Sequence, residues 1–281
     1  MLQLMRWMEP SSIRNLATEY CQKEAQCSGY IIRADVRQAV LSWRLLLAGA
    51  AFALLLLLSG LEPVLNAVRS DDPPPDGFHG KLVYDALSSD AALLALPILC
   101  TLPYGAAYIE DIKTGFIKLY ISRSSRRDYV LGKFAGCFFS GGLVPVLGTL
   151  LAYGISTLIF SPMEAAVEEG AEAVVWLWDT LAVCGRLFLS GGFWAFWGMA
   201  LSAYMESKYI PYAAPFVTYY LFIILHERYL PALYVIDPKG WLWPEDIWPL
   251  GAWSAAVFVL ELAAIALLCF AAAVRRRVSE L

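Results

Sequence analysis

The chain has 281 residues, of which 59% are hydrophobic and 16% are charged, and its mean hydropathy is +0.57. Because so few polar residues cannot cover a soluble domain of ordinary composition, the composition predicts an integral membrane protein, and the helical apolar segments described below make the predicted class all-α and multi-pass. The net charge of −4 and the absence of a long like-charged tail argue against a nucleic-acid partner.

The sequence lacks the short motifs of the common enzyme and metal-binding classes. It contains no HExxH, GxSxG or CxxC pattern, and its six cysteines and two histidines form no cluster. We therefore expect no catalytic residue, no disulfide and no metal site in this chain. The phosphate-binding pattern GxxxxGK[ST] is also absent, so a second polypeptide must bind ATP if ATP drives the protein.

Residues 1–43 are predicted to form a cytoplasmic N-terminal segment. Their periodicity is weak before residue 31, with a helix predicted only over about 11–26. From 31 to 43, apolar residues interleave with charges at a spacing that favours an amphipathic helix lying along the inner membrane surface. A plain helical extension of the first membrane span is the alternative.

Six apolar segments within residues 44–274 predict six membrane-spanning helices, because a crossing needs roughly 20 apolar residues. Pro97 and Pro103 are expected to kink the second span, and Pro211 and Pro215 lie near the start of a short fifth span. Small residues in the third and fourth spans favour close helix contact. The predicted spans are 45–61, 91–108, 134–160, 181–204, 210–225 and 252–274, and residues 275–281 form a cytoplasmic tail that begins with three arginines.

The segments between the spans differ in charge and in aromatic content. Residues 62–90 and 161–180 are acidic and are predicted to be outer loops. Residues 226–251 are rich in Trp, Pro and acids, which predicts a broken helical hairpin that dips into the outer leaflet. Residues 205–209 are expected to form a short inner turn.

The segment between the second and third spans, residues 110–133, is strongly basic. It carries six Lys or Arg against three acids, so it is predicted to stay on the cytoplasmic side. With both termini inside, 16 of the 21 Lys and Arg fall in inner segments and 15 of the 25 acids fall in outer loops. The charges therefore predict a protein of the cytoplasmic membrane with both termini in the cytoplasm.

The same segment resembles the region between spans two and three in permeases of type-2 ATP-binding-cassette (ABC) exporters. The resemblance rests on an acidic residue, a glycine, an apolar residue, a Ser-Arg pair, an aromatic residue and a Gly-Lys pair, in the order Glu110, Gly115, Ile117, Ser122, Arg123, Tyr129, Gly132 and Lys133. An N-terminal interfacial helix, six spans and a membrane-dipping hairpin before the last span also resemble this family. The extra thirty N-terminal residues and the short fifth span depart from it.

The resemblance implies the permease subunit of a bacterial exporter that moves an amphipathic or lipid-like substrate across the cytoplasmic membrane. In that family the segment includes a coupling helix that docks into a separate ATPase subunit, which binds ATP and Mg, and two permease chains form a homo- or heterodimer. The implied ATPase-coupling residues are Glu110, Gly115, Ile117, Ser122, Arg123, Arg126, Arg127, Asp128, Tyr129 and Lys133. These cations could instead only enforce topology or contact anionic lipid headgroups. The alternative function is a non-transporting scaffold, sensor or immunity component with a permease-like fold.

Two charges and five aromatic residues in or beside the predicted spans complete the candidate site residues. Arg186 and Glu261 lie at similar depth, and charges inside a membrane are costly, so they are expected to pair or to line one cavity. An arginine that reaches outward and a protonated glutamate packed in the bundle are the alternative. The resemblance implies a substrate cleft along spans two and five. Its candidate lining residues are Tyr104, Phe216, Tyr219, Tyr220 and Phe222. The alternative is that these aromatics are ordinary core or lipid-facing residues.

Overall fold

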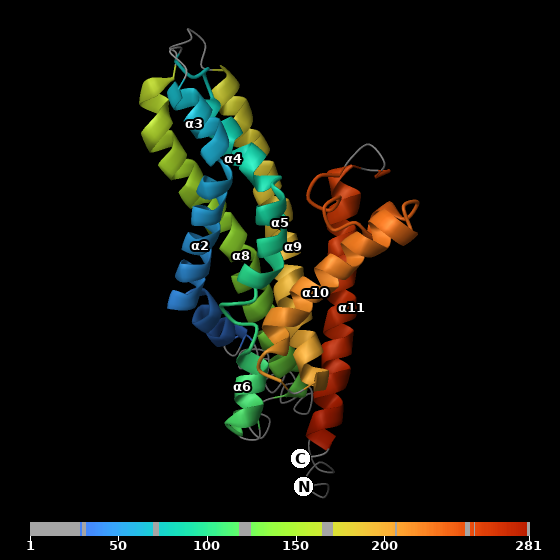
Figure 1. Ribbon diagram of the computed structural model, residues 1–281. Coiled ribbons are helices and arrows are strands. Elements are labelled where there is room, and N and C mark those ends of the chain that lie inside the picture. Colours follow the sequence, from blue (N-terminus) through green and yellow to red (C-terminus); the bar gives the residue numbers. More distant parts are fainter. Residues whose placement is uncertain are drawn as a thin grey trace, which may run out of the picture.

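The computed structural model describes residues 29, 32–69, 73–117, 125–164, 171–205, 207–244, 248–249 and 251–279, so the helix predicted over 11–26 lies outside the described residues. Within these ranges the chain consists of helices and turns without a strand, and the predicted all-α class is confirmed (Figure 1). An N-terminal helix, Ile32–Val40, precedes the α-helices labelled in Figure 1. These are α2 (Trp43–Ser59), α3 (Leu61–Arg69), α4 (Phe78–Leu87), α5 (Asp90–Leu99), α6 (Ala107–Lys113), α8 (Arg126–Phe160), α9 (Ala171–Met205), α10 (Ile210–Ile224) and α11 (Ala252–Ser279). Three short 3-10 or π-helical turns are η2 (Ser161–Met163), η3 (Leu225–Tyr229) and η4 (Tyr234–Ile236).

The two longest helices, α8 and α9, pack side by side and form the centre of the bundle (Figure 1). Each has 35 residues, which corresponds to roughly 52 Å at about 1.5 Å per residue. Glycines allow the close approach: a Cβ added to Gly142 would lie 2.5 Å from the Phe188 carbonyl oxygen, and one added to Gly192 would lie 2.8 Å from that of Phe138. The prediction that small residues bring these two helices into close contact is confirmed. Helix α2 packs on α8, while α10 and α11 pack on α9.

Several of these helices are candidate membrane spans. Two stretches, Arg126–Met163 and Ala252–Arg277, are each long and apolar enough to cross a membrane. Three bent pairs also qualify when each pair is taken as one span: Ile32–Val40 with Trp43–Ser59, Phe78–Leu87 with Asp90–Leu99, and Val175–Met205 with Ile210–Tyr229. The described residues thus contain two to five candidate spans by this criterion, which supports a membrane protein.

Helix α2 begins after a break in the chain and is not an extension of the N-terminal helix. The Ser42 hydroxyl oxygen accepts a hydrogen bond from the Leu45 N–H at 3.4 Å, and the extended backbone of Ser42 separates the two helices. Their axes differ by 47°. The two helices are therefore not one straight helix, and a straight extension of the first span is excluded.

The segment predicted as an outer loop, 62–90, is largely helical, because the structure contains α3 and α4 there. Four apolar residues of α4 are buried where it packs on α8 and α9, whereas Asp85 faces outward. Figure 1 shows α3 and α4 lying beside the ends of α8 and α9, beyond the start of α11. At roughly 52 Å, α8 and α9 are longer than a hydrocarbon core of about 30 Å is thick. The second acidic stretch is also partly helical, since α9 begins at Ala171. The buried residues of α4 are Leu82, Val83, Ala86 and Leu87.

The predicted second span, 91–108, is not one kinked helix. Helix α5 ends at Leu99, residues 100–106 form turns, and α6 begins at Ala107. Pro103 explains the interruption, because it cannot donate to the carbonyl of Leu99 and its ring crowds the preceding turn. The 10 residues of α5 cover only about 15 Å. Together with α4, whose axis differs by 66°, α5 qualifies as a candidate span.

The predicted helical hairpin at 226–251 is also wrong for the residues that the structure describes in that region. They form the last four residues of η3, the single turn η4 and irregular turns, because Pro231, Pro238 and Pro244 interrupt any longer helix. The segment folds over the bundle, and Trp241 is 2% exposed. Its ring stacks on that of Trp194 in α9, with centroids 5.7 Å apart.

Two helices extend beyond their predicted ends at the end of the bundle that carries α6. Helix α8 begins at Arg126, eight residues before the predicted span. Helix α11 continues through the arginines at 275–277 to Ser279, so these arginines do not end it. The reason is that basic residues can end the membrane-embedded part of a helix while the helix itself continues into the water.

Candidate functional site around Lys133

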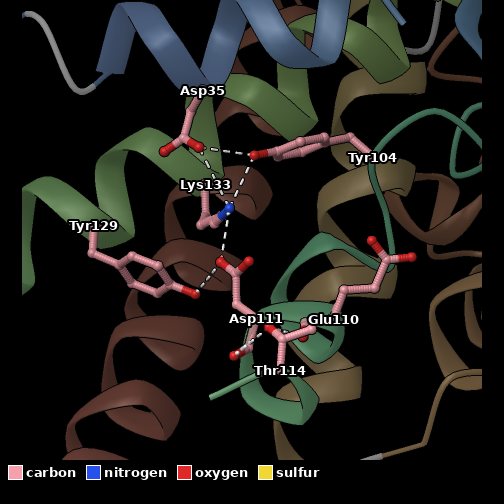
Figure 2. Close-up of polar contacts among 7 residues, drawn as sticks. All are labelled: Asp35, Tyr104, Glu110, Asp111, Thr114, Tyr129 and Lys133. Carbon is pink, nitrogen blue, oxygen red and sulfur yellow. Dashed lines mark hydrogen bonds and ion pairs between the residues drawn. The ribbon is translucent and has the colours of Figure 1, made fainter. Parts of the chain in front are cut away.

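Lys133 lies in the second turn of α8 and is 4% exposed, although the sequence predicts it on a docking surface. Its Nζ is 2.9 Å from Asp111 Oδ2 and 3.4 Å from Asp35 Oδ1, and it donates to the Tyr104 hydroxyl at 3.0 Å. Figure 2 shows the ammonium between the two carboxylates. A buried cation requires such partners, because an unpaired buried charge costs several kcal/mol.

Four parts of the chain meet at this ammonium. Asp35 comes from the N-terminal helix, Tyr104 from the turns after α5, Asp111 from α6, and Lys133 with Tyr129 from α8. The Tyr104 hydroxyl donates to Asp35 Oδ1 and the Tyr129 hydroxyl donates to Asp111 Oδ2, both at 2.9 Å (Figure 2). We call these five residues the Lys133 cluster.

The aromatic rings of the cluster also contact the cation. Lys133 Nζ lies 5.1 Å from the ring centroid of Tyr104 and 5.6 Å from that of Tyr129. Cation–π contacts at this distance are worth about 0.5–2 kcal/mol, with the larger values in desolvated sites. The cluster is therefore a compact connection between helices rather than a flexible surface ion pair.

Glycines on α8 allow the N-terminal helix to reach the cluster. A Cβ on Gly132 would lie 2.5 Å from Asp35 Oδ2, and a Cβ on Gly136 would lie 3.1 Å from the Tyr104 ring. Gly132 and Gly136 stand four residues apart and so lie on the same helix face. From the sequence, both glycines are predicted to be packing residues and Gly132 is also part of the Gly-Lys pair of the resemblance, whereas Asp35 and Asp111 have no predicted role. The Gly-x-x-x-Gly spacing beside Lys133 is the one local signal that could have indicated this junction.

A cavity of about 620 Å³ lies beside the Lys133 cluster. It is bounded by the N-terminal helix, the start of α2 and α6, and its lining includes Asp35, Lys133, Trp43 and Phe116. Glu110 and Arg44 lie at its wall as a half-exposed ion pair with a separation of 3.9 Å. Such an exposed pair contributes at most about 1 kcal/mol, and in Figure 2 the Glu110 side chain turns away from the cluster.

The residues predicted for ATPase coupling separate into a buried and an exposed group. Ile117, Tyr129 and Lys133 are buried. Glu110, Arg126 and Arg127 are exposed, Asp128 is half-buried at the start of α8, and Gly115 is in a turn with φ +72°. Ser122 and Arg123 lie outside the described residues. The exposed group is thus the part of the segment that a soluble partner can contact.

Arg126 and Arg127 also border a groove between α8 and α11. The groove has a volume of about 250 Å³, and Arg275 completes its polar rim. Among the described residues no carboxylate lies within 4 Å of these three arginines. The remaining lining is apolar and consists of Val130, Leu131, Leu267, Ala271 and Val274.

The structure does not pair Arg186 with Glu261. Arg186 Nε donates to the carbonyl oxygen of Leu242 at 2.6 Å, in the segment that folds over the bundle. Glu261 is exposed on α11, and no ion pair involving it occurs in the described part of the chain. The guanidinium of Arg186 therefore has a backbone carbonyl as its hydrogen-bond acceptor, and it does not need the carboxylate of Glu261 for this purpose.

The five aromatics predicted for a substrate cleft occupy three different places. Tyr104 belongs to the Lys133 cluster, and Tyr219 and Phe222 pack against Trp194 inside the bundle. Phe216 and Tyr220 lie together on α10 with parallel rings 6.4 Å apart, and Tyr220 is 50% exposed. Of the five, Tyr220 is the most accessible to a neighbouring chain or substrate.

Comparison with protein-family models and with curated proteins gives no match for this sequence. The described residues also contain no group of three or more His, Cys, Asp or Glu that could hold a metal ion.

Proposed function

We propose that this chain is the permease subunit of a type-2 ABC exporter, driven by a separate ATPase subunit that binds the segment 110–133. The observation that supports this best is the Lys133 cluster, which joins α6, α8 and the N-terminal helix through buried polar contacts. In this proposal the substrate is amphipathic or lipid-like, and ATP and Mg bind to the partner subunit.

The cluster suits the transmission of movement from a soluble partner to the membrane helices. Asp111 on α6 bonds to Lys133 and Tyr129 on α8, so α6 cannot move far without displacing α8. Asp35 extends the same connection to the N-terminal helix. Because separating a buried ion pair is costly, these three elements are expected to move as one body.

The helix directions support six spans in this proposal. Val175–Met205 and Ile210–Tyr229 meet at 116°, so the chain reverses and the two helices are better counted as separate crossings. The arginines at 126–127 and 275–277 lie at the α6 end, and the positive-inside rule favours a cytoplasmic position for that end. The protein then belongs to the cytoplasmic membrane of a bacterium with both termini inside.

A second permease chain is expected beside α10. Its exposed face carries Val217 (60% exposed), Tyr220 and Leu221 (49% exposed), which would contact lipid or a partner helix. A dimer would place these aromatics at the boundary between the two chains, where the family has its cleft.

The test is co-expression with the ATPase encoded beside this gene, followed by purification in mild detergent. We expect the two proteins to co-purify and ATP turnover to depend on the permease. Arg126→Glu with Arg127→Glu should weaken the association. Asp35→Asn should leave the association intact and lower the stimulation of ATP turnover at least about fivefold, the lower end of typical coupling between sites.

Arg33→Gln is the matched control, because Arg33 is exposed on the same helix as Asp35. It should change neither association nor turnover. If no ATPase co-purifies and turnover is independent of this chain, the exporter proposal fails, and a non-transporting scaffold, sensor or immunity component becomes the better description.

A further inference from the structure

The groove between α8 and α11 lies where two candidate membrane spans share an end. Helix α8 belongs to the candidate span Arg126–Met163, and α11 contains the candidate span Ala252–Arg277. Arg126 and Arg127 therefore stand at the start of one span, and Arg275 stands in the last turn of the other. We call the space that these three arginines border the Arg275 groove. It lies at the polar boundary of two stretches that are each apolar enough to cross a membrane.

The floor of the Arg275 groove is apolar and runs from the arginines into the candidate spans. Leu267, Ala271 and Val274 are separated by four and three residues, so they lie on one face of α11. Leu267 precedes Arg275 by eight residues, which corresponds to about 12 Å along the helix. A soluble partner that stays outside the membrane does not reach the far end of this floor, whereas a lipid chain does. The residues of α8 that complete the floor are Val130 and Leu131.

The rim of the groove is cationic, and neighbouring side chains do not neutralise it. All three arginines are exposed, and in the described part of the chain no carboxylate lies within 4 Å of any of them. Among the described residues that line the groove, none is acidic. Guanidinium groups bind phosphate oxygens through paired, charge-assisted hydrogen bonds. The rim therefore favours an anionic phosphate group.

The size and polarity of the groove limit what this phosphate is attached to. The volume of about 250 Å³ is below the range of small-molecule sites, which is about 300–1,000 Å³, so the groove holds one part of a molecule. An apolar floor gives no hydrogen bonds to the polar remainder of a nucleotide or a sugar phosphate. A phospholipid suits both parts, because its phosphate lies at the membrane boundary and its acyl chains extend inward. A zwitterionic headgroup brings a cation that the arginines repel, so an anionic lipid is favoured.

We propose that the Arg275 groove is a binding site for one anionic phospholipid. Arg126, Arg127 and Arg275 hold its phosphate, and one acyl chain lies along the apolar floor. This site differs from a general attraction of basic residues to lipid headgroups, because it combines cations from two helices with a place for one chain. It requires that α8 and α11 lie in a membrane and does not depend on ATP-driven export.

The experiment uses the full chain, purified in mild detergent and stripped of lipid, and counts bound lipids by native mass spectrometry. Dioleoyl phosphatidylglycerol is compared with dioleoyl phosphatidylcholine, because the two have the same acyl chains and differ in net charge. We expect the first phosphatidylglycerol to bind at least about fivefold more tightly than the first phosphatidylcholine. Arg275→Gln should weaken the binding of phosphatidylglycerol roughly fivefold, since one arginine near anionic lipid contributes about this factor.

Ala271→Phe tests the floor of the groove, because it fills the space for the chain and keeps every charge. It should also weaken the binding of phosphatidylglycerol. The midpoint of thermal unfolding is measured for each variant, so that a loss of lipid binding is separated from a loss of folding.

Arg276→Gln is the matched control, because Arg276 is the exposed neighbour of Arg275 on α11 and does not line the groove. It removes the same charge and should bind phosphatidylglycerol as the wild type does. Glycerol phosphate in excess tests whether a free phosphate is the occupant. We expect it to leave the lipid bound, because it lacks an acyl chain.

The proposal is overturned if phosphatidylglycerol binds no better than phosphatidylcholine, or if Arg275→Gln or Ala271→Phe leaves its binding unchanged. It is also overturned if Arg276→Gln weakens binding as much as Arg275→Gln does, or if glycerol phosphate displaces the lipid. In each of these cases the arginines at 126–127 belong to the docking surface for the ATPase alone.

The lipid measurements require no ATPase, so the two proposals fail separately. Arg275 lies outside the segment 110–133, so Arg275→Gln should lose lipid affinity and still co-purify with the ATPase. A failure of the ATPase assay leaves lipid binding untouched, and absent lipid binding leaves the exporter proposal untouched.

Discussion

Replacing Lys133 by methionine removes the ammonium of the cluster while it keeps a side chain of similar length. Asp35 and Asp111 lie 3.4 and 2.9 Å from Nζ, so the variant leaves the buried carboxylate of Asp35 and the partly buried carboxylate of Asp111 without their cation. Removing one partner of a buried ion pair typically destabilises a protein by about 3–5 kcal/mol. At about 2–4 °C per kcal/mol for a chain of this size, the midpoint of thermal unfolding should fall by roughly 6–20 °C.

The assay is thermal unfolding of the purified protein in one detergent, followed by intrinsic tryptophan fluorescence. Lys113→Met is the matched control, because Lys113 is exposed on α6 and should change the midpoint by no more than about 2 °C. The triple variant Lys133→Met, Asp35→Asn, Asp111→Asn removes all three charges and should recover much of the loss. The reasoning is refuted if Lys133→Met has the same midpoint of thermal unfolding as the wild type, or if the triple variant is no more stable than Lys133→Met alone.

Three further predictions test the junction, the outer helices and the orientation. Gly132→Ala should lower the stability by about 1–3 kcal/mol in the same unfolding assay, because its Cβ would lie 2.5 Å from Asp35 Oδ2. The control is Gly154→Ala on the same helix. Its Cβ would meet nothing within 4 Å, so this variant should be neutral or stabilising. Glu164→Gln should speed hydrogen exchange at the start of α4, because its carboxylate accepts from the Gly77 N–H, the His79 N–H and the His79 ring; unchanged exchange would contradict this capping role. Lys113→Cys in a background with Cys21, Cys27 and Cys269 replaced by Ser should react with a membrane-impermeant maleimide only after the membrane is opened, and labelling in intact cells would reverse the proposed orientation.

The sequence located most of the long helices, because a run of apolar residues and the charges beside it are local properties. It missed α3 and α4, since their acids dominate the composition of residues 62–90. Leu82, Val83, Ala86 and Leu87 have the spacing of one helix face, but they are buried only because α4 packs on α8 and α9. The predicted hairpin failed for a similar reason: its tryptophans indicated an interface, whereas Trp241 is inserted among the rings of the bundle.

The candidate site was less predictable than the fold. Lys133 stands in a basic segment, so its sequence context indicates an exposed contact residue. Its burial depends on Asp35, which is 98 residues away, and on Asp111, which reaches it from a different helix. No local sequence pattern predicts a contact between residues so far apart in the chain.

By itself, the sequence determined that this protein is helical and suited to a membrane, and it determined where the basic and acidic segments lie along the chain. These properties follow from composition and from the order of neighbouring residues. Only the tertiary structure decided which charges are buried, which glycines admit another helix, and which arginines border a groove. The physical reason is that desolvation, ion pairing and close packing depend on distances between residues that are remote in the chain and become neighbours only when the helices pack.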